Sequence, residues 1–320
     1  MSLTYTGMPL DRCTNQRKNK AWLKRQFNSH KTLFALIHDG DNFFQRDKPL
    51  NPLYLRLDQL PGVSVNSCVF LGKDESVVMF ALDSNKLNFA DLQAIEQLGV
   101  WQQLRQLGSV IPAVDAAILA LAKGLVFWHR THLYCGKCGS LSQLIEAGHA
   151  RRCTNSDCHK INFPRTDPAV IMLVERMFDD GVARCLLGRQ RSWPSGVYST
   201  LAGFVDPGES LEEAVTREVH EESGINVKDV NYVRSQPWPF PASVMLGFTA
   251  IASTEAIDVS NDDLETAQWF SRQQLQLFAS REGSKEDNHE VQQGQYKYSS
   301  SDSIAYFLIQ AWKNKQIGTY

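Results

Sequence analysis

The sequence predicts an α+β protein whose C-terminal half folds as an α/β/α sandwich. A cysteine-bracketed hairpin and an N-terminal α+β domain precede it. Three observations predict this architecture. Short apolar strands alternate with two amphipathic helices in the C-terminal half. Two close cysteine pairs interrupt the middle of the chain, and alternating or apolar runs dominate the first third. We expect domains at residues 1–130, 131–164 and 165–320.

Length and charge limit the class of protein. The 320 residues leave room for two or three domains. With 33 basic and 35 acidic residues, the chain has no global basic field for nucleic acid or membranes. The apolar stretch from Ile111 to Trp128 is interrupted by Asp115 and Lys123 and is too short to span a bilayer. The start, MSLTYTGMPLDRC, lacks a signal-peptide pattern, so we expect a cytoplasmic protein.

The N-terminal domain reads as a small sheet followed by helices. The runs TLFALIHDGDNFF, SVNSCVFLG and SVVMFAL are typical of strands, and GKDE predicts a hairpin turn between the last two. We expect helices over Asn88 to Leu107 and over Ala113 to His129. The residues of this domain reveal no chemistry of their own, and no internal repeat is evident in the chain.

The cysteine pairs predict a structural Zn²⁺ site. Cys135 and Cys138 form a C-x2-C knuckle, and Cys153 and Cys158 form a C-x4-C pair after fourteen residues. Four thiolates would close a zinc tetrahedron. The wider second pair leaves His159 as a substitute ligand. The odd total of seven cysteines does not suggest a disulfide framework. The alternative to a zinc site is therefore a chance cluster of reduced cysteines without metal.

The C-terminal domain begins with strands. Ala169 to Val174 and the run ARCLLGRQ, which places Cys185 in the core, predict two of them, and NYVRSQ and VMLGFTAIAS predict two more. The polar segment from Ser280 to Ser301 predicts a mobile loop. A last helix is expected over Ser303 to Lys313.

Between those strands, GFVDPGESLEEAVTREVHEESGI predicts a helix from Ser210 to Ser223. Ser210 and Glu213 have the spacing of a capping box, and Gly224 stands where a left-handed cap belongs. One stripe at helical spacing is apolar and should be buried; it consists of Leu211, Ala214, Val215 and Val219.

Three glutamates of this helix, Glu218, Glu221 and Glu222, crowd onto one spot at the edge of the apolar stripe. Like charges three or four residues apart repel each other. Partly buried carboxylates need cations beside them, and an all-oxygen site suits Mg²⁺ or Mn²⁺. A solvated acidic face is the alternative interpretation.

A third segment, SQPWPFPAS at residues 235–243, carries three prolines within five residues. Prolines at this density exclude a helix and an ordinary central strand. They would hold Trp238 and Phe240 in fixed directions on an extended loop. A proline-rich surface turn is the alternative.

The helix segment resembles the signature of the Nudix hydrolases. All nine specified positions of that signature are filled, by Gly203, Glu209, Arg217, Glu218, Val219, Glu221, Glu222, Gly224 and Ile225. The resemblance implies cleavage of a diphosphate linked to a nucleoside or similar group. It implies that Glu218 and Glu222 bind the divalent metal and that Glu221 binds metal or moves a proton. Arg217 would position Glu209.

SQPWPFPAS and the preceding cysteine hairpin resemble the NADH pyrophosphatase branch of that family, from about Tyr134 onward. This resemblance implies a homodimer that hydrolyses NADH to reduced nicotinamide mononucleotide and AMP, and removal of NAD caps from RNA. It places further metal ligands at the Ala202 carbonyl and at Glu265, although Glu265 could equally be a solvated side chain. It places substrate contacts at Phe163, Gln236, Pro237, Trp238, Pro239, Phe240, Pro241, Ala242, Ser243 and Ala305.

Other functions stay open at this point. One alternative is a broader ADP-ribose or dinucleotide diphosphatase. Another is a non-catalytic nucleotide sensor or RNA-binding Nudix regulator, for which the ribbon offers a small basic face of Lys137, Arg151, Arg152 and Lys160. The complete set of signature carboxylates favours an enzyme. The sequence does not rank NADH, NAD⁺, deamino-NAD and NAD-capped RNA as substrates, nor Mg²⁺ against Mn²⁺.

Overall fold

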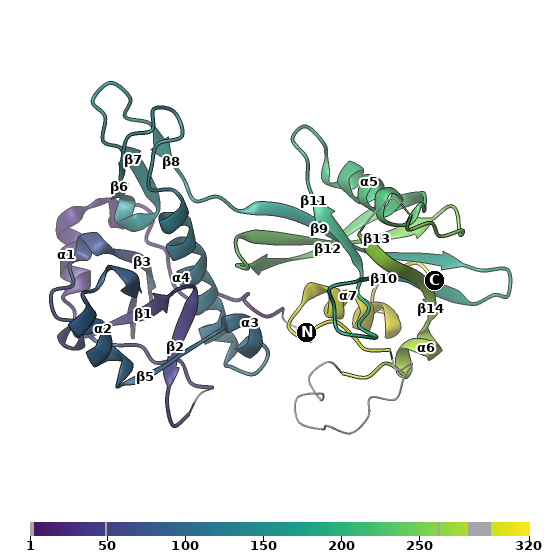
Figure 1. Cartoon of the computed structure of the whole chain (residues 1–320), viewed down its shortest axis with the longest axis horizontal. Coiled ribbons are helices and arrows are strands. Elements are labelled where there is room, and N and C mark those ends of the chain that lie inside the picture. The colour runs from purple at the N-terminus through teal and green to yellow at the C-terminus, as the bar shows by residue number, and fades with distance from the viewer. Residues whose placement is uncertain (1–2, 49, 261–262, 281–295) are drawn as a thin grey trace. The chain divides into compact units, whose positions relative to one another are not determined.

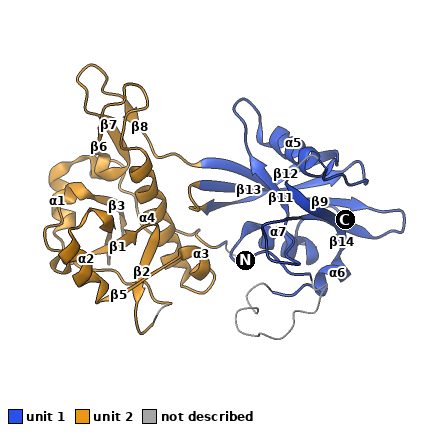
Figure 2. Cartoon of the chain, viewed as in Figure 1, with its two compact units in different colours: residues 1–3, 167–237, 243–320 blue, residues 4–166, 238–242 orange. Residues whose placement is uncertain are grey.

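The computed structural model describes residues 3–48, 50–260, 263–280 and 296–320. These residues form two compact units (Figures 1 and 2). The N-terminal unit, orange in Figure 2, contains Thr4–Thr166 together with the short segment Trp238–Ala242. The C-terminal unit, blue in Figure 2, contains the rest of the described chain.

The described residues of the N-terminal unit build a five-stranded sheet with the order β3-β4-β1-β2-β5. Its strands are β1 (Thr32–His38), β2 (Asp41–Gln45), β3 (Cys68–Lys73), β4 (Val78–Asp83) and β5 (Gly99–Gln102). β1 runs parallel to β4, and the other neighbours are antiparallel. The three apolar runs are therefore strands, and the expected hairpin between β3 and β4 is confirmed.

Helices cover both faces of this sheet. The α-helices are α1 (Lys20–Phe27), α2 (Phe89–Glu96), α3 (Leu104–Leu107) and α4 (Ala113–Thr131), and the short 3-10 turns are η1 (Gln16–Lys18), η2 (Leu57–Gln59), η3 (Val65–Ser67) and η4 (Ser84–Lys86). One face packs on apolar residues of α4 such as Leu125 and Val126. The other face packs on Phe27 of α1.

The single helix expected over Asn88 to Leu107 is wrong. The structure has α2, then strand β5, then the short α3 in this range. β5 pairs antiparallel with β2, and Gly99 lies so close to it that an added Cβ would meet the Phe44 carbonyl oxygen at 2.5 Å and the Phe43 ring at 2.7 Å. Val100 and Trp101 are good strand formers, and they were the local signal for this edge strand.

The cysteine hairpin is a three-stranded sheet of β6 (Ser142–Ile145), β7 (Ala150–Cys153) and β8 (Ile161–Asn162), with the 3-10 turn η5 (Glu146–Gly148) after β6. A buried polar network joins it to α4. Arg151 Nη1 lies 3.0 Å from His129 Nδ1, and His129 Nε2 lies 2.7 Å from the Gly148 carbonyl oxygen. Because arginine only donates, His129 accepts at Nδ1 and carries its proton at Nε2. Arg151 also donates to Ser142 through Nε, at 2.8 Å.

The C-terminal unit confirms the α/β/α sandwich. Its main sheet has the order β12-β13-β9-β10-β14 in the described residues, and β11 pairs with β9. The strands are β9 (Asp167–Met177), β10 (Ala183–Gln190), β11 (Leu201–Phe204), β12 (Val227–Trp238), β13 (Ser243–Ala252) and β14 (Leu264–Ser271), and the helices are α5 (Leu211–Ser223), α6 (Arg272–Gln276) and α7 (Ile304–Lys313). α7 packs on the face of Ile171 and Leu173, and α5 packs on the opposite face with Val170 and Met172.

The two main sheets share one topology. When β11 is left out of the numbering, the strands of each sheet, counted in chain order, are arranged third, fourth, first, second, fifth, and the fourth strand is parallel to the first. A helix follows the fifth strand in both units, α4 in one and α7 in the other. The described residues between β2 and β3 contain only 3-10 turns where the C-terminal unit has β11 and α5. The N-terminal unit thus has the same fold without the glutamate helix, although no sequence repeat reveals it.

Cys185 is fully buried in the core, as expected. The loop predicted at Ser280 to Ser301 falls largely on residues 281–295, which lie outside the described residues. Among the helices that the structure describes, none is both long and apolar enough to cross a membrane.

Candidate functional site

The glutamate helix begins and ends where the sequence predicts. Ser210 is the N-cap residue of α5, and its hydroxyl accepts from the Glu213 N–H while the Glu213 carboxylate accepts from the Ser210 N–H. Gly224 closes the helix in the left-handed region, with φ +68°. The apolar stripe packs on the sheet, and Val215 and Val219 are fully buried. This fixed rotation of α5 sets the direction of its glutamates.

Arg217 gathers the carboxylates of this segment. Its guanidinium donates to Glu209 at 2.6 and 3.1 Å, to Glu218 at 2.8 Å and to Glu221 at 2.9 Å. It also donates to the Phe204 carbonyl oxygen of β11 at 2.8 Å. These hydrogen bonds, with Glu209 first, raise the pKa of Arg217, and the bond from Arg217 lowers the pKa of Glu209. The structure therefore brings Glu209, Arg217, Glu218 and Glu221 together.

A glycine holds the Glu218 carboxylate against strand β11. A Cβ added to Gly203 would lie 1.8 Å from Glu218 Cδ and 2.0–2.1 Å from its two carboxylate oxygens. The carboxylate thus occupies the space that any other residue at 203 would fill. Its neighbour on the strand, Ala202, pairs with Ile171 of β9. Glu218 has an exposed fraction of 14% and Glu222 one of 8%, so both carboxylates are largely removed from water.

These residues fit a hard divalent cation. Partly buried carboxylates next to a backbone strand give an all-oxygen donor set, which Mg²⁺ and Mn²⁺ prefer. Two of the carboxylates, those of Glu218 and Glu221, are held by Arg217 in this structure. Among the described residues, the glutamates do not form a group whose ligand atoms all lie within 4.8 Å of one another.

The remaining expected metal and substrate residues lie on several elements. Glu265 of β14 forms an ion pair with Arg189 of β10 at 2.6 Å, a partner that sequence reasoning missed. Gln236 is fully buried; it donates to the Asp302 carbonyl oxygen at 2.7 Å and accepts from the Ile304 N–H at 2.8 Å. It therefore fixes the start of α7, on which Ala305 is buried. Phe163 belongs to the N-terminal unit, and its exposed fraction is 65%.

The proline-rich motif is divided between the two units. Gln236 and Ser243 belong to the C-terminal unit, whereas Trp238–Ala242 belongs to the N-terminal unit. There Trp238 and Phe240 pack edge-to-face at 5.1 Å between ring centroids, and both contact the Tyr5 ring, at 6.0 and 5.6 Å. The sequence carries no local signal for Tyr5 as their partner, because the contact spans more than 230 residues.

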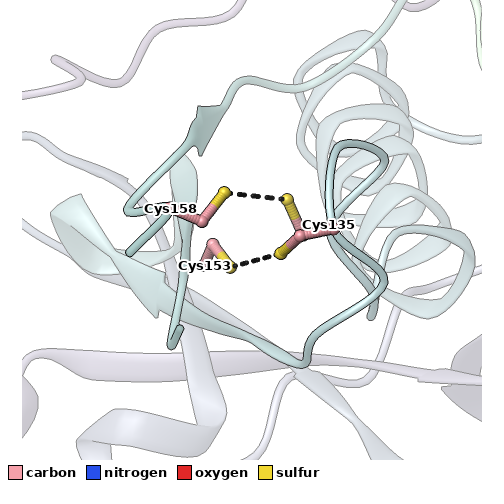
Figure 3. A group of neighbouring side chains, drawn as sticks. Cys135, Cys153 and Cys158 are labelled. Atoms are coloured by element: carbon pink, nitrogen blue, oxygen red, sulfur yellow. Dashed lines mark hydrogen bonds between the residues drawn. The ribbon is translucent and has the colours of Figure 1, made fainter. Parts of the chain in front are cut away.

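The four cysteines form a compact cluster. Their sulfur atoms all lie within 4.8 Å of one another; Cys135 lies 3.8 Å from Cys158, and Cys138 lies 3.4 Å from Cys153. Figure 3 shows the labelled side chains pointing toward one another. Because Cys158 completes the set, His159 is not needed as a ligand. Four sulfurs at this separation fit tetrahedral Zn²⁺.

The electrostatics of the cluster agree with a bound cation. Hydrogen bonds from Ser140 lower the pKa of Cys138 to about 6, and the Lys137 N–H lowers the pKa of Cys135. Burial instead raises the pKa of Cys153 to about 12. A buried thiol of this kind becomes a thiolate at neutral pH when a cation compensates its charge.

The expected basic face of the ribbon is partly wrong. Arg151 is 3% exposed and is held by the network with His129 and Ser142 described above. Lys137, Arg152 and Lys160 are exposed. Of the four cations that suggested an RNA contact, three are therefore on the surface and one is a structural link.

Family models match three successive parts of the chain. Residues 165–291 match the model described as "NUDIX domain". Residues 130–159 match the "NADH pyrophosphatase zinc ribbon domain". Residues 31–128 match the "NADH pyrophosphatase-like rudimentary NUDIX domain", which agrees with the shared topology of the two sheets.

Curated relatives are similar over much of the chain. The human protein "NAD-capped RNA hydrolase NUDT12" is 33% identical over 83% of this chain and 65% of its own length. "Nudix hydrolase 19, chloroplastic" of Arabidopsis thaliana is 41% identical over 67% of this chain and 51% of its own. "NAD(P)H pyrophosphatase NUDT13, mitochondrial" of Mus musculus is 44% identical over 79% of this chain and 76% of its own. The chain thus spans 65% of the human relative and about half of the Arabidopsis relative.

Proposed function

The chain belongs to the Nudix hydrolase family, with the domains of its NADH pyrophosphatase branch, and from this premise we propose that it hydrolyses the diphosphate of NADH. The products would be reduced nicotinamide mononucleotide and AMP. The observation that carries this proposal is the segment from β11 to α5. It joins a complete set of signature carboxylates to a glycine that leaves room for one of them.

A divalent ion supplies the charge neutralisation and the acidified water that diphosphate hydrolysis needs. In the proposed site, Glu218 and Glu222 hold Mg²⁺ or Mn²⁺ with the Ala202 carbonyl oxygen and Glu265. Glu221 is exposed and either joins the ligands or accepts the proton of the attacking water. Arg217 fixes Glu209 and limits the mutual repulsion of the carboxylates. The four cysteines hold Zn²⁺ in a structural role.

The substrate contacts are proposed at Phe163, Ala305 and the motif from Gln236 to Ser243. Gln236 orders the start of α7, so it would position Ala305. The aromatic face of Phe163 is exposed and suits stacking on a flat base or nicotinamide ring. The homodimer and the cytoplasmic location expected from the sequence stay part of this proposal.

Removal of NAD caps from RNA is a second candidate activity. One of the relatives, the human protein NUDT12, is named an NAD-capped RNA hydrolase. Lys137, Arg152 and Lys160 on the ribbon are exposed and could contact RNA phosphates. Two alternatives are a broader ADP-ribose or dinucleotide diphosphatase and a non-catalytic regulator. Kinetic measurements distinguish both of them from an NADH diphosphatase.

Steady-state hydrolysis of NADH, ADP-ribose and diadenosine polyphosphate, each with Mg²⁺ or Mn²⁺, tests the proposal. We expect NADH to give the highest kcat/KM. We expect Glu222→Gln to lower it by about 100-fold or more, as loss of a group needed for the chemical step does. Glu212→Gln is the matched control, because Glu212 is exposed in the first turn of the same helix.

Equal turnover of the three substrates would remove the NADH assignment and favour the broader diphosphatase. An unaffected Glu222→Gln variant would remove the metal role of Glu222. Absence of hydrolysis with either ion, together with tight nucleotide binding, would favour the non-catalytic regulator.

A further inference from the structure

The N-terminal unit contains a pocket of about 410 Å³. The turn between β1 and β2, the start of α3, one side of α4 and the segment Pro239–Pro241 line it. This volume lies in the range of small-molecule sites, about 300–1,000 Å³. The glutamate helix and the zinc cluster do not line this pocket, but Pro239–Pro241 belong to the motif that is proposed above to contact the substrate.

The pocket is not the counterpart of the metal site. α4 follows the fifth strand of its sheet, as α7 does in the C-terminal unit. Ile37, which lines the pocket, packs on the α4 face of the sheet. The glutamate helix α5 packs on the face opposite α7, so the topology places the pocket on the other side of the shared fold. The pocket is therefore a feature of the N-terminal unit in its own right.

Two cations of the pocket are available to an anion. Lys123 is half-buried on α4 and donates to the Gly40 carbonyl oxygen, which leaves two of its three N–H groups for other partners. Burial lowers the pKa of Lys123, and the charge of Asp41 only partly offsets this. Arg105 of α3 is exposed, and within the described residues it makes no ion pair. An anionic ligand would give both cations a negatively charged partner.

The third cation of the pocket, Arg130, has a structural role. Arg130 lies 3.0 Å from Asp39 and 3.5 Å from Asp83, and Asp39 also accepts from Asn85 at 2.7 Å. These bonds hold the turn between β1 and β2 in place. Arg130 is thus committed to two carboxylates, whereas Lys123 and Arg105 form no ion pair in the described residues, and the Arg105 guanidinium lies 5.8 Å from the Trp238 ring centroid.

Aromatic and polar groups complete the lining. Phe127 and Phe240 both line the pocket, and the Phe240 ring lies 5.7 Å from the Lys123 ammonium. Asn42, which is not itself a lining residue, pairs with the lining residue Ile37 across the sheet and is fully buried. Both polar atoms of its side chain lack a hydrogen-bond partner among the described residues. Such groups need a polar partner when they are buried.

We propose that this pocket is a binding site for a nucleoside monophosphate. The phosphate would lie against Lys123 and Arg105, since a dianion matches two cations that form no ion pair in the described residues. The base would pack on the Phe240 or Phe127 ring, as flat rings do. Asp41 and Gln103, which also line the pocket, would offer acceptors for ribose hydroxyls. A free phosphate ion would leave the aromatic side unused, and an uncharged nucleoside would leave the cations unpaired.

Calorimetric titration of the full-length, zinc-loaded Glu222→Gln protein with AMP tests this site, in buffer without Mg²⁺ or Mn²⁺. This variant separates binding from hydrolysis, so the result does not depend on which substrate the metal site takes. We expect AMP to bind, and we expect adenosine and inorganic phosphate alone to bind at least about tenfold more weakly. Arg105→Gln and Lys123→Gln, each added to this protein, should each weaken AMP by about tenfold or more.

The matched control is Lys20→Gln, which removes an exposed cation from α1 and should leave AMP affinity unchanged. Arg105 is exposed, so its variant tests the site even if Lys123→Gln disturbs folding. Photo-crosslinking with 8-azido-AMP should label α3 or α4, because labelling of residues 238–242 alone would also result from AMP bound as a reaction product. No AMP binding, unchanged affinity in Arg105→Gln, or labelling confined to residues 201–225 would each overturn the proposal.

Discussion

At the scale of single residues, the position of the Glu218 carboxylate depends on the absence of a side chain at Gly203. The Glu218 carboxylate lies where a Cβ at position 203 would be, at 1.8 Å from its carbon. The atoms in conflict belong to the end of a flexible side chain. A methyl group at 203 would therefore displace the carboxylate and leave the backbone of β11 in place.

We therefore expect Gly203→Ala to fold and yet to hydrolyse NADH poorly. A catalytic group displaced by about 1 Å can cost about 100-fold in rate, and the displacement here is larger. Steady-state kinetics and circular dichroism measure the two effects separately. Gly136→Ala is the matched control, because a Cβ at Gly136 would meet nothing within 4 Å. Full activity of Gly203→Ala would show that the Glu218 position is not needed for catalysis.

At the scale of elements, the ribbon is attached to α4 through a histidine that must stay neutral. His129 accepts from Arg151 and donates to Gly148, and a protonated ring could not accept. Burial lowers the pKa of His129 to about 3. Nearby, burial lowers the pKa of His149 to about 4, where its ring contacts the Phe70 carbonyl oxygen at 2.6 Å.

These shifts predict that acid destabilises the N-terminal unit. An unfolded histidine takes up its proton near pH 6.5, whereas folded His129 does so only near pH 3. Between these pH values the unfolded chain binds more protons than the folded chain does. The stability that neutral His129 contributes is therefore fully present above pH 6.5, and it is lost as the pH falls below that value. We expect the urea midpoint of unfolding of this unit to fall steadily between pH 7.5 and pH 4.5.

His129→Gln isolates the contribution of this residue. Glutamine offers an acceptor and a donor without titrating, so the variant should lose less stability in acid than the unaltered protein. The comparison is made at pH values where both proteins have the same zinc content, so that zinc release by protonated thiols does not contribute to the difference. Parallel pH dependences in the two proteins would rule out His129 as a source of the acid sensitivity.

At the scale of the whole molecule, local patterns predicted what local forces determine. The boundaries of α5 follow from Ser210, Glu213 and Gly224, because caps act within one turn. The spacing of the cysteines likewise predicted a cluster that forms within one hairpin. Both features depend on residues that are close in sequence, so the printed sequence was sufficient for them.

Features that depend on packing between residues far apart in the sequence could not be predicted from local patterns. Val100 and Trp101 favour a strand locally, but β5 is a strand because β2 lies open at the sheet edge and Gly99 fits against it, and this pairing is not encoded within residues 88–107. The burial of Arg151 requires His129 of α4, and the ion pair of Glu265 requires Arg189 of another strand. The shared topology of the two sheets is likewise a property of strand order and not of residue identity.

The division of the proline-rich motif gives the last prediction. Trp238 and Phe240 stand in the sequence of the hydrolase domain, yet they pack against the core of the N-terminal unit beside Tyr5. Trp238 is half-buried, so Trp238→Ala should cost that unit about 2 kcal/mol of unfolding free energy, less than a fully buried tryptophan would. The loss should open the N-terminal unit and spare the sheet of β9, β10 and β13.

Hydrogen exchange measured by mass spectrometry separates the two units in one experiment. In Trp238→Ala, amides of α3 and α4 should exchange faster, whereas those of β9 and β10 should keep their protection. Tyr232→Ala is the matched control, because Tyr232 lies six residues earlier on β12 and 57% of it is exposed. If exchange instead quickens only in the C-terminal unit, the aromatic motif stabilises the hydrolase sheet. The packing of Trp238 and Phe240 around Tyr5 would then contribute little to the stability of the N-terminal unit.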